Sequence, residues 1–298
     1  RTMSSKSISR ESYQQAVLYS LLSSMCLAIA AAFASHLTQY AALPVIIFCR
    51  FFIPLLLILG YSLRCKTIKF QTDCIKFHIL RSCFTVGSQY ALFYVLTHSS
   101  ILMGTLLYST SGLFSPIISR IWLKINVPAK TVISIVISFI GVSIALDVWQ
   151  LHITLVMVIG LISGVLAAFS QITQHYTSKH DSHYTSNIYL FGCSSLFSLL
   201  LLAPSAIHYH QWHEIINVNL SFLFFLLLFS LFSIGNQTYR LMAYNKVNKS
   251  SSLAPFLYMV IFFSGVIDWV FYNIKPDWNV LMGVCIIIFG GVIMSIRK

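Results

Sequence analysis

Residues 252–278 read SLAPFLYMVIFFSGVIDWVFYNIKPDW, an apolar run long enough to cross a lipid bilayer. Pro255 lies near its start, Tyr258 follows about one turn later, and the carboxylate of Asp268 lies near its far end. Polar groups at membrane depth are costly, so they require a partner, a water-filled cavity or a function. The run therefore poses one question: whether Asp268 and its neighbours bind a solute or hold helices together.

The composition of the chain is typical of a membrane protein. Of its 298 residues, 57% are hydrophobic and only 9% are charged, whereas a soluble domain carries about 25% charged residues. The net charge of +12 lies in short segments between apolar runs, which indicates membrane topology rather than nucleic-acid binding. The seven cysteines are scattered and form no C-x-x-C pair, a pattern that favours neither disulfides nor zinc. We therefore expect no cofactor, no metal and no nucleic-acid partner.

Ten apolar runs can be marked along the chain, each close to the length of about 20 residues that crosses the hydrocarbon core. The connections between them are short and leave no room for a soluble domain. This pattern predicts an all-α polytopic membrane protein with ten transmembrane helices. The runs are 16–34, 43–63, 77–96, 101–119, 130–149, 153–174, 186–206, 219–240, 252–273 and 279–296.

The basic residues predict how these helices are oriented. In the ten-helix arrangement 17 of them lie on one side, Lys275 lies on the other, and Arg50 is inside a run. Because positive charge stays on the cytoplasmic side, we expect both termini in the cytoplasm and the chain in a bacterial inner (plasma) membrane. The run 16–34 is expected to be a retained span rather than a cleaved signal peptide. The 17 residues are Arg1, Lys6, Arg10, Arg64, Lys66, Lys69, Lys76, Arg81, Arg120, Lys124, Lys130, Lys179, Arg240, Lys246, Lys249, Arg297 and Lys298.

The chain also matches itself at an offset of 150 residues. Five runs fall in each half, so residues 151–298 would repeat residues 1–150 with the opposite orientation in the membrane. Transporters built this way bind their solute where the two repeats meet and expose it to each side in turn. The matched residues include Tyr94, Ser100 and Tyr108 in the first half and Tyr244, Ser250 and Tyr258 in the second.

Short patterns occur in a characteristic order along the chain. Residues 48–52 read FCRFF, residues 78–81 read HILR, residues 253–258 read LAPFLY, and Gly290-Gly291 follows. Together they resemble the drug/metabolite transporter superfamily in its ten-helix EamA-type form. The resemblance spans nearly the whole chain and implies a secondary transporter with a cavity between the two halves.

Within that superfamily, HILR and the Ala-Pro-Phe-x-Tyr pattern are most similar to carriers for S-adenosylmethionine uptake. The sequence departs from the family at the ends of the fourth and ninth helices, where a Gly-Glu pair is common. Residues 124–125 and 273–274 read Lys-Ile and Asn-Ile at those places. No role of that glutamate can therefore be transferred to this chain.

Two charged side chains at similar depth are the first candidates for a site. Arg50 lies about 10 Å inside its run at 1.5 Å per residue, and Asp268 lies about as deep in another. In one interpretation they pair with each other or cap backbone groups and hold the bundle together. In the other they face the cavity, where Arg50 binds a substrate carboxylate and Asp268 an amine or a proton.

Aromatic and amide side chains at mid-helix depth complete the candidate set. Tyrosine rings can stack on a planar or cationic ligand, although tyrosine is also common at membrane interfaces. Polar side chains at this depth join helices about as often as they contact ligands. The predicted substrate-binding residues are Arg50, Gln89, Tyr94, Tyr108, Asn236, Gln237, Tyr258 and Asp268, with Ser109 and Ser111 as further polar candidates.

Two histidine groups could suggest a metal site. Short loops without an evident fourth ligand favour solvated histidines instead. Glycines in the patterns 160–164 and 290–291 are expected only to let helices pack closely. The histidines are His175, His180 and His183 in a predicted cytoplasmic loop, and His208, His210 and His213 beside Glu214 outside.

No phosphate loop of the GxxxxGK[ST] type and no GxSxG or HExxH motif occurs in the chain. We therefore predict a secondary transporter, not an enzyme, that moves a small organic metabolite by alternating access. The resemblance implies an amino acid or an amino-acid-containing or cationic solute such as S-adenosylmethionine. The alternatives are a membrane-embedded enzyme or lipid-modifying subunit, and a non-transporting receptor or assembly factor. The runs 130–149 and 279–296 would serve as scaffold or as the surface of a homodimer.

Overall fold

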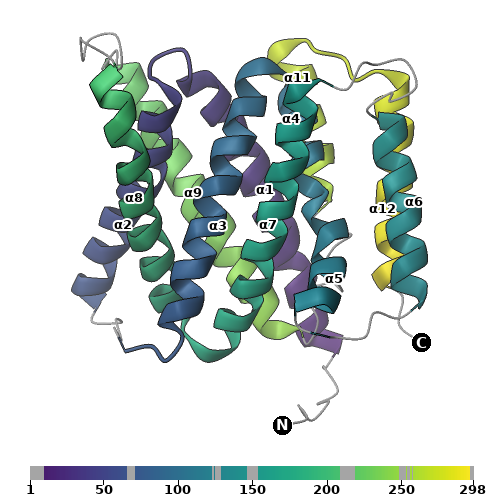
Figure 1. Cartoon of the computed structure of the whole chain (residues 1–298), viewed down its shortest axis with the longest axis horizontal. Coiled ribbons are helices and arrows are strands. Elements are labelled where there is room, and N and C mark those ends of the chain that lie inside the picture. The colour runs from purple at the N-terminus through teal and green to yellow at the C-terminus, as the bar shows by residue number, and fades with distance from the viewer. Residues whose placement is uncertain are drawn as a thin grey trace.

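The computed structural model describes residues 10–65, 71–122, 124, 129–145, 154–208, 219–247, 253, 256 and 258–295. The named elements in these residues are all α-helices, and they stand side by side with their axes roughly along one direction (Figure 1). The predicted all-α polytopic membrane fold is confirmed. The helices are α1 (Arg10–Leu37), α2 (Leu43–Cys65), α3 (Ile75–His98), α4 (Ile101–Ser109), α5 (Ser111–Trp122), α6 (Ala129–Ala145), α7 (Leu155–His180), α8 (His183–His208), α9 (Leu220–Lys246), α11 (Met259–Tyr272) and α12 (Trp278–Ser295).

Length and apolar composition identify the chain as an integral membrane protein. In the described residues, six helical stretches are long and apolar enough to cross a bilayer, and the α4–α5 stretch Ile101–Trp122 is one of them. Shorter apolar helices occupy Val132–Ala145, Met259–Tyr272 and Trp278–Gly290. Each predicted run overlaps one of the described helices. The count of ten spans and the inverted repeat stay predictions.

Several helices begin at a polar side chain that binds the free backbone N–H groups of the first turn. Ser100 and Thr154 accept from the third N–H of α4 and α7. The Asn219 side chain accepts the N–H of Phe222 at 2.7 Å and so caps α9. Asn273 ends α11 in the left-handed region, with φ 54°, a conformation that asparagine tolerates well. These caps explain why the helices begin and end at polar positions between apolar runs.

The centre of the bundle is held by pairs of helices from the two halves of the chain. The closest pairs are α1 with α9 and α3 with α7, followed by α2 with α8. Reciprocal hydrogen bonds join the first two pairs: Ser23 and Asn236 each donate to the other's carbonyl, at 3.0 and 3.3 Å. Ser88 and Ser163 do the same between α3 and α7, at 2.9 and 3.0 Å. These bonds hold the backbones of the paired helices close together.

Two arginines assigned to cytoplasmic segments lie inside the bundle instead. Arg81 belongs to α3 and is 1% exposed, and Arg240 belongs to α9 and is 4% exposed. The predicted run ended at Arg240, whereas α9 continues to Lys246. His175 and His180 are likewise in α7 rather than in a loop.

Helices α6 and α12 form a separate pair at one edge of the bundle (Figure 1). Their backbones meet at glycines, because a Cβ on Gly283 would lie 2.5 Å from both the Gly141 carbonyl oxygen and the Ala145 Cβ. The close packing expected of the glycine pattern 160–164 is also present, since Gly160 faces Leu107 in direct contact.

Replacing Gly283 with alanine is expected to destabilise the protein by about 1–3 kcal/mol, because the methyl group overpacks the α6–α12 contact. The matched control is Gly265→Ala in α11, where the new Cβ would meet Leu102 at an ordinary 3.5 Å. That control should be as stable as the parent or more so, since alanine has the higher helix propensity. Thermal unfolding in detergent compares the two, and equal stability would contradict the close approach.

Candidate functional site

A break in the helical path lies beside the candidate site. The predicted run 101–119 is not one regular helix, because α4 ends at Ser109 and α5 begins at Ser111. Thr110 closes a tighter turn between them: its N–H and its hydroxyl donate to the carbonyl of Leu107, at 3.2 and 2.6 Å. Hydroxyl side chains that bond the nearby backbone compete with regular helical bonding in this way.

A glycine and a proline shape the first turns of α5. Pro116 has no N–H, so the carbonyl of Gly112, four residues earlier, receives no helical hydrogen bond from it. Gly112 also makes room for Tyr258, since a Cβ at position 112 would lie 2.5 Å from the Tyr258 hydroxyl oxygen. The ring of Tyr258 therefore reaches the backbone of α5 at this point.

A small cavity of about 20 Å³ lies at the break. This volume is enough for about one water molecule and too small for an organic ligand. Residues of α1, α4, α5, α7, α9 and α11, together with the residue before α11, form its wall. The lining residues are Leu27, Tyr108, Ser109, Ser111, Gly112, Gln171, Arg240, Tyr258 and Val260.

Two polar groups in this wall have unused hydrogen-bonding capacity. Arg240 Nε and the Tyr258 hydroxyl are buried and have no hydrogen-bond partner among the described residues. Other groups in the wall are paired: Gln171 Nε2 donates to Ser111 Oγ at 2.9 Å, and the Arg240 side chain bonds the Tyr108 hydroxyl. An unpaired buried polar group costs about 1–3 kcal/mol. A bound group that accepts from both donors would stabilise this wall.

Three buried arginines, Arg50, Arg81 and Arg240, form what we call the arginine cluster. Arg240 is within electrostatic range of both others. The only ion pair in the described part of the chain joins Asp181 to His78, one turn before Arg81 on α3, so no carboxylate there pairs directly with an arginine of the cluster. The site is therefore strongly cationic for an interior position.

Each member of the cluster is held by neutral groups. The Arg50 guanidinium carbon lies 5.3 Å from the ring centre of Phe93 and 5.2 Å from that of Phe229. Both distances allow cation–π attraction, which fixes Arg50 between α3 and α9. Arg81 Nη1 donates to Ser186 Oγ at 2.8 Å, and its Nη2 donates to Gln237 Oε1 at 3.2 Å.

The structure brings part of the predicted substrate-binding set together. Tyr108 and Tyr258, matched by the 150-residue offset, line the same cavity. Arg50 lies within electrostatic range of Tyr108. Gln237 is not a lining residue but bonds Arg81 of the arginine cluster, and it also accepts from Gln174 Nε2 at 3.3 Å.

Three other predicted residues do not line the cavity. Gln89 is buried in α3, and its Oε1 has no partner among the described residues. Tyr94 is half-buried near the end of α3 and stacks on His98 with 4.3 Å between ring centres. Asn236 joins α9 to the Ser23 carbonyl of α1, as described above.

Asp268 lies at the start of α4 rather than beside Arg50. Its Oδ2 accepts the N–H of Leu102 at 2.7 Å, and its side chain is 2% exposed. The N-terminus of a helix carries partial positive charge and free N–H groups, so a carboxylate is stabilised there. This geometry favours the interpretation in which Asp268 holds helices together.

The predicted set did not include Arg240 and Gln171, which line the cavity. The spacing of polar residues along α9 could have identified Arg240. Asn236, Arg240 and Tyr244 are four residues apart and therefore share one face of α9. Since Asn236 was expected to face the interior, the same argument would have placed Arg240 there too. No comparable signal marks Gln171, whose role depends on the position of α5.

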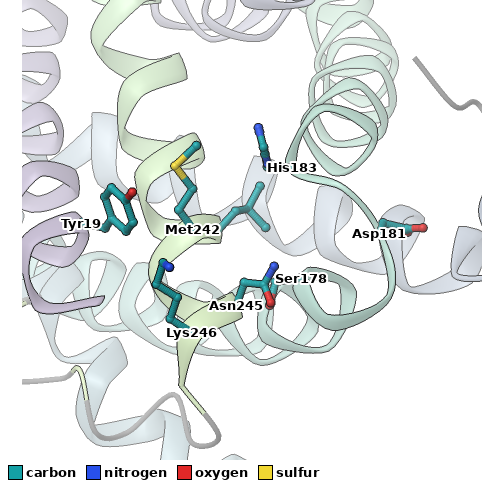
Figure 2. A pocket seen from close by; sticks show the side chains of 8 residues that line it. Tyr19, Ser178, Asp181, His183, Met242, Asn245 and Lys246 are labelled. Carbon is teal, nitrogen blue, oxygen red and sulfur yellow. The ribbon is translucent and has the colours of Figure 1, made fainter. Parts of the chain in front are cut away.

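A larger, open pocket of about 300 Å³ lies at the end of the bundle where α7 and α9 finish. Figure 2 shows Tyr19, Met242 and Lys246 together on one side, with His183 across from them and the Asp181 carboxylate directed away. Leu241 lines this pocket while Arg240 lines the small cavity, so consecutive residues of α9 border both spaces.

The turn between α7 and α8 is fastened to α3 beside this pocket. His78 Nε2 and Asp181 Oδ2 are 2.7 Å apart, and Thr72 donates its hydroxyl to the same oxygen at 2.7 Å. Burial and the carboxylates of Asp181 and Asp73 raise the pKa of the neighbouring Cys74 thiol, which lies before α3. Cys74 therefore stays protonated near neutral pH.

The described residues contain no group of three or more side chains suited to a metal ion. His183 lies at the start of α8 and lines the open pocket. The metal-site question for His210, His213 and Glu214 falls outside the described residues.

Part of the chain matches a known protein family. Residues 14–146, which run from α1 to α6, match the model of the EamA-like transporter family. The resemblance inferred from the ordered patterns is confirmed for these residues, and the similarity to the S-adenosylmethionine subgroup stays a prediction.

Known proteins resemble the chain beyond the EamA-like region. The riboflavin transporter of Vibrio cholerae serotype O1 (strain ATCC 39315 / El Tor Inaba N16961) is 30% identical over 169 residues. The match covers 56% of this chain and 53%, about half, of that relative. A solved crystal structure superposes on 96% of both chains with a TM-score of 0.67 at 14% identity. That likeness shows the fold alone.

The EamA-like region supplies only part of the cavity wall. Tyr108, Ser109 and Gly112 come from it, whereas Arg240 and Tyr258 come from the second half of the chain. The site therefore depends on how the EamA-like region packs against α7, α9 and α11.

Proposed function

We propose that the protein is a secondary transporter that moves a small organic solute by alternating access. The observation that carries this proposal is the small cavity at the break between α4 and α5, lined by polar groups from both halves of the chain. Discontinuous helices at membrane depth are typical of solute sites in transporters, because they free backbone groups for a ligand. The EamA-like region favours this function over a membrane-embedded enzyme or a receptor.

The packing of the helices supports two repeats, residues 1–150 and 151–298. If α1, α2, α3 and α6 are exchanged with α7, α8, α9 and α12, the close pair α1–α9 becomes α7–α3, which is also close. The pairs α2–α8 and α6–α12 map onto themselves. Inverted repeats require this exchange symmetry, and it lets the same contacts rearrange on either side of the cavity.

Access to the cavity would come from the end of the bundle that carries the open pocket. The bonds from Arg81 to Ser186 and Gln237, and from Gln174 to Gln237, join α3, α7, α8 and α9 in this part. Separating them would connect the two spaces that meet at residues 240 and 241 of α9. On the charge pattern this end is cytoplasmic, with both termini there, in a bacterial inner membrane.

The wall of the cavity and the curated relative support a set of candidate solutes. Tyrosine rings and hydrogen-bonding groups suit an amino acid, S-adenosylmethionine or a flavin. The relative named a riboflavin transporter supports adding flavins to the candidates. The outer faces of α6 and α12 remain the proposed surface for a homodimer.

A ligand screen tests the proposal. Purified protein is heated with amino acids, nucleosides, S-adenosylmethionine, polyamines or riboflavin, and its unfolding is followed by tryptophan fluorescence. A ligand at 100 times its Kd adds about 2.7 kcal/mol of stability. We expect one class to stabilise the parent and the same compound to enter proteoliposomes that contain the protein.

Matched variants locate the binding site within that screen. Tyr258→Phe should lose most of the stabilisation, because it removes the free hydroxyl of the cavity wall. Tyr94→Phe makes the same chemical change outside the cavity and should keep the stabilisation, as should Asp268→Asn. Equal stabilisation of Tyr258→Phe and the parent would contradict direct contact with this wall.

A further inference from the structure

We propose that the arginine cluster selects a solute with a negatively charged group, a carboxylate or a phosphate. This inference deepens the proposed transport function and rests on it. It narrows the solute class from polar organic molecules to anions and zwitterions, and it excludes purely cationic solutes such as polyamines.

The arginine cluster holds several positive charges away from water. Arg50, Arg81 and Arg240 are 5%, 1% and 4% exposed, so all three are removed from water. Arginine stays protonated in proteins. Like charges that share a low-dielectric interior repel one another, and each one also loses its hydration. The cluster is therefore an unfavourable arrangement of like charges that a bound negative group would relieve.

The neighbours of the cluster hold the arginines in position without cancelling their charge. Phe93 and Phe229 attract Arg50 through their ring faces, and Ser186 and Gln237 accept from Arg81 as neutral groups. These contacts fix the geometry of the guanidinium groups before a ligand arrives. Such preorganisation lowers the entropic cost of binding.

The buried carboxylate of Asp268 is not the counterion of the cluster. Asp268 accepts the N–H of Leu102 in the first turn of α4. Tyr108, which bonds Arg240, is six residues further along α4, about 9 Å at 1.5 Å per residue. The described residues contain no ion pair between Asp268 and any arginine.

The hydrogen-bond donors of the cavity wall also favour an anionic group. Arg240 Nε is a donor without a partner in the described part of the protein, and the hydroxyl of Tyr258 also lacks one there. A carboxylate or phosphate oxygen accepts several hydrogen bonds, so one such group can satisfy both donors. The planar fork of arginine is suited to these anions. Geometry and charge thus require the same kind of ligand group.

Matched probe pairs test the inference on the purified full-length protein. Riboflavin is compared with riboflavin 5′-phosphate, adenosine with AMP, and an amino acid with its amide, by their effect on thermal unfolding. Within at least one pair the anionic probe should bind about ten-fold more tightly, or by about 1.4 kcal/mol. Sodium phosphate and sodium chloride are measured alone, to separate an organic solute from an inorganic ion.

Variants assign the preference to the cluster. Arg240→Gln should abolish the preference for the anionic probe, and Arg240→Lys should restore part of it. Arg64→Gln, which removes an exposed arginine at the end of α2, should leave it unchanged. In the ligand-free protein Arg240→Gln should not lower the unfolding temperature, because it removes repulsion within the cluster.

The outcomes separate this inference from the transport proposal. Equal binding within every probe pair, or an unchanged preference in Arg240→Gln, would overturn the anion selectivity even if uptake is observed. Full stabilisation by phosphate or chloride alone would also overturn it, because the cluster would then hold an inorganic ion. Anion-selective stabilisation without uptake into proteoliposomes would support the inference and contradict the transport function.

Discussion

Asp268→Ala is expected to lower the free energy of unfolding by about 2–3 kcal/mol, because it removes a buried charged acceptor and a helix cap together. The carboxylate is almost fully buried and accepts the N–H of Leu102 at 2.7 Å. Without it, the first turn of α4 keeps free N–H groups in an apolar environment. Unfolding in detergent, followed by tryptophan fluorescence, measures the loss.

Two further variants define the cause of that loss. Asp268→Asn keeps an acceptor oxygen in the same place, so it should lose clearly less stability than Asp268→Ala. Asp277→Ala removes an exposed carboxylate just before α12, so it should lose clearly less stability than Asp268→Ala. If Asp268→Ala is as stable as Asp277→Ala, the capping role is wrong and a role in solute or proton binding gains support.

The fold was largely predictable because hydropathy alone determines where long apolar helices can form. The low charge content indicated a polytopic membrane protein, and the described helices overlap the predicted runs. The break at Thr110 was missed, since Ser109-Thr110-Ser111-Gly112 is too short a polar stretch to interrupt an apolar run. Only the hydrogen bonds to the Leu107 carbonyl reveal that the helix is interrupted there.

The site was predictable only in part, for a different physical reason. Tyr108 and Tyr258 were found because both lie in apolar runs and match across the 150-residue offset. Arg81 and Arg240 were taken as topology signals, since an arginine near the end of a run has the same sequence pattern whether it is exposed or buried. The partner of Asp268 could not be predicted, because a backbone N–H of another helix leaves no trace in residue types.

Substitution of Gly112, the glycine at the helix break, changes the cavity most directly. Replacing Gly112 with leucine would fill a space of about 20 Å³ and push the side chain against Tyr258. Overpacking of this kind costs about 1–3 kcal/mol of folding stability. The side chain also takes the space of the solute, and a loss of about 1.4 kcal/mol of binding free energy weakens binding about ten-fold. We therefore expect solute binding and transport to fall by about ten-fold or more.

Gly60 in α2 provides the matched control, because a Cβ at that position would meet nothing within 4 Å. Gly60→Leu makes the same chemical change on the exposed side of a helix and should leave solute binding and transport unchanged. Gly112→Ala gives a smaller step at the cavity and should reduce transport less than Gly112→Leu. Each variant is first shown to elute as a single folded species in detergent.

The central claim is that solute passes through the cavity between α5 and Tyr258. The measurement that tests it is the initial rate of uptake into proteoliposomes of the compound that stabilises the parent most. The structure predicts uptake in the order parent, Gly112→Ala, Gly112→Leu, with Gly60→Leu equal to the parent. Uptake by folded Gly112→Leu at the rate of the parent would contradict the account.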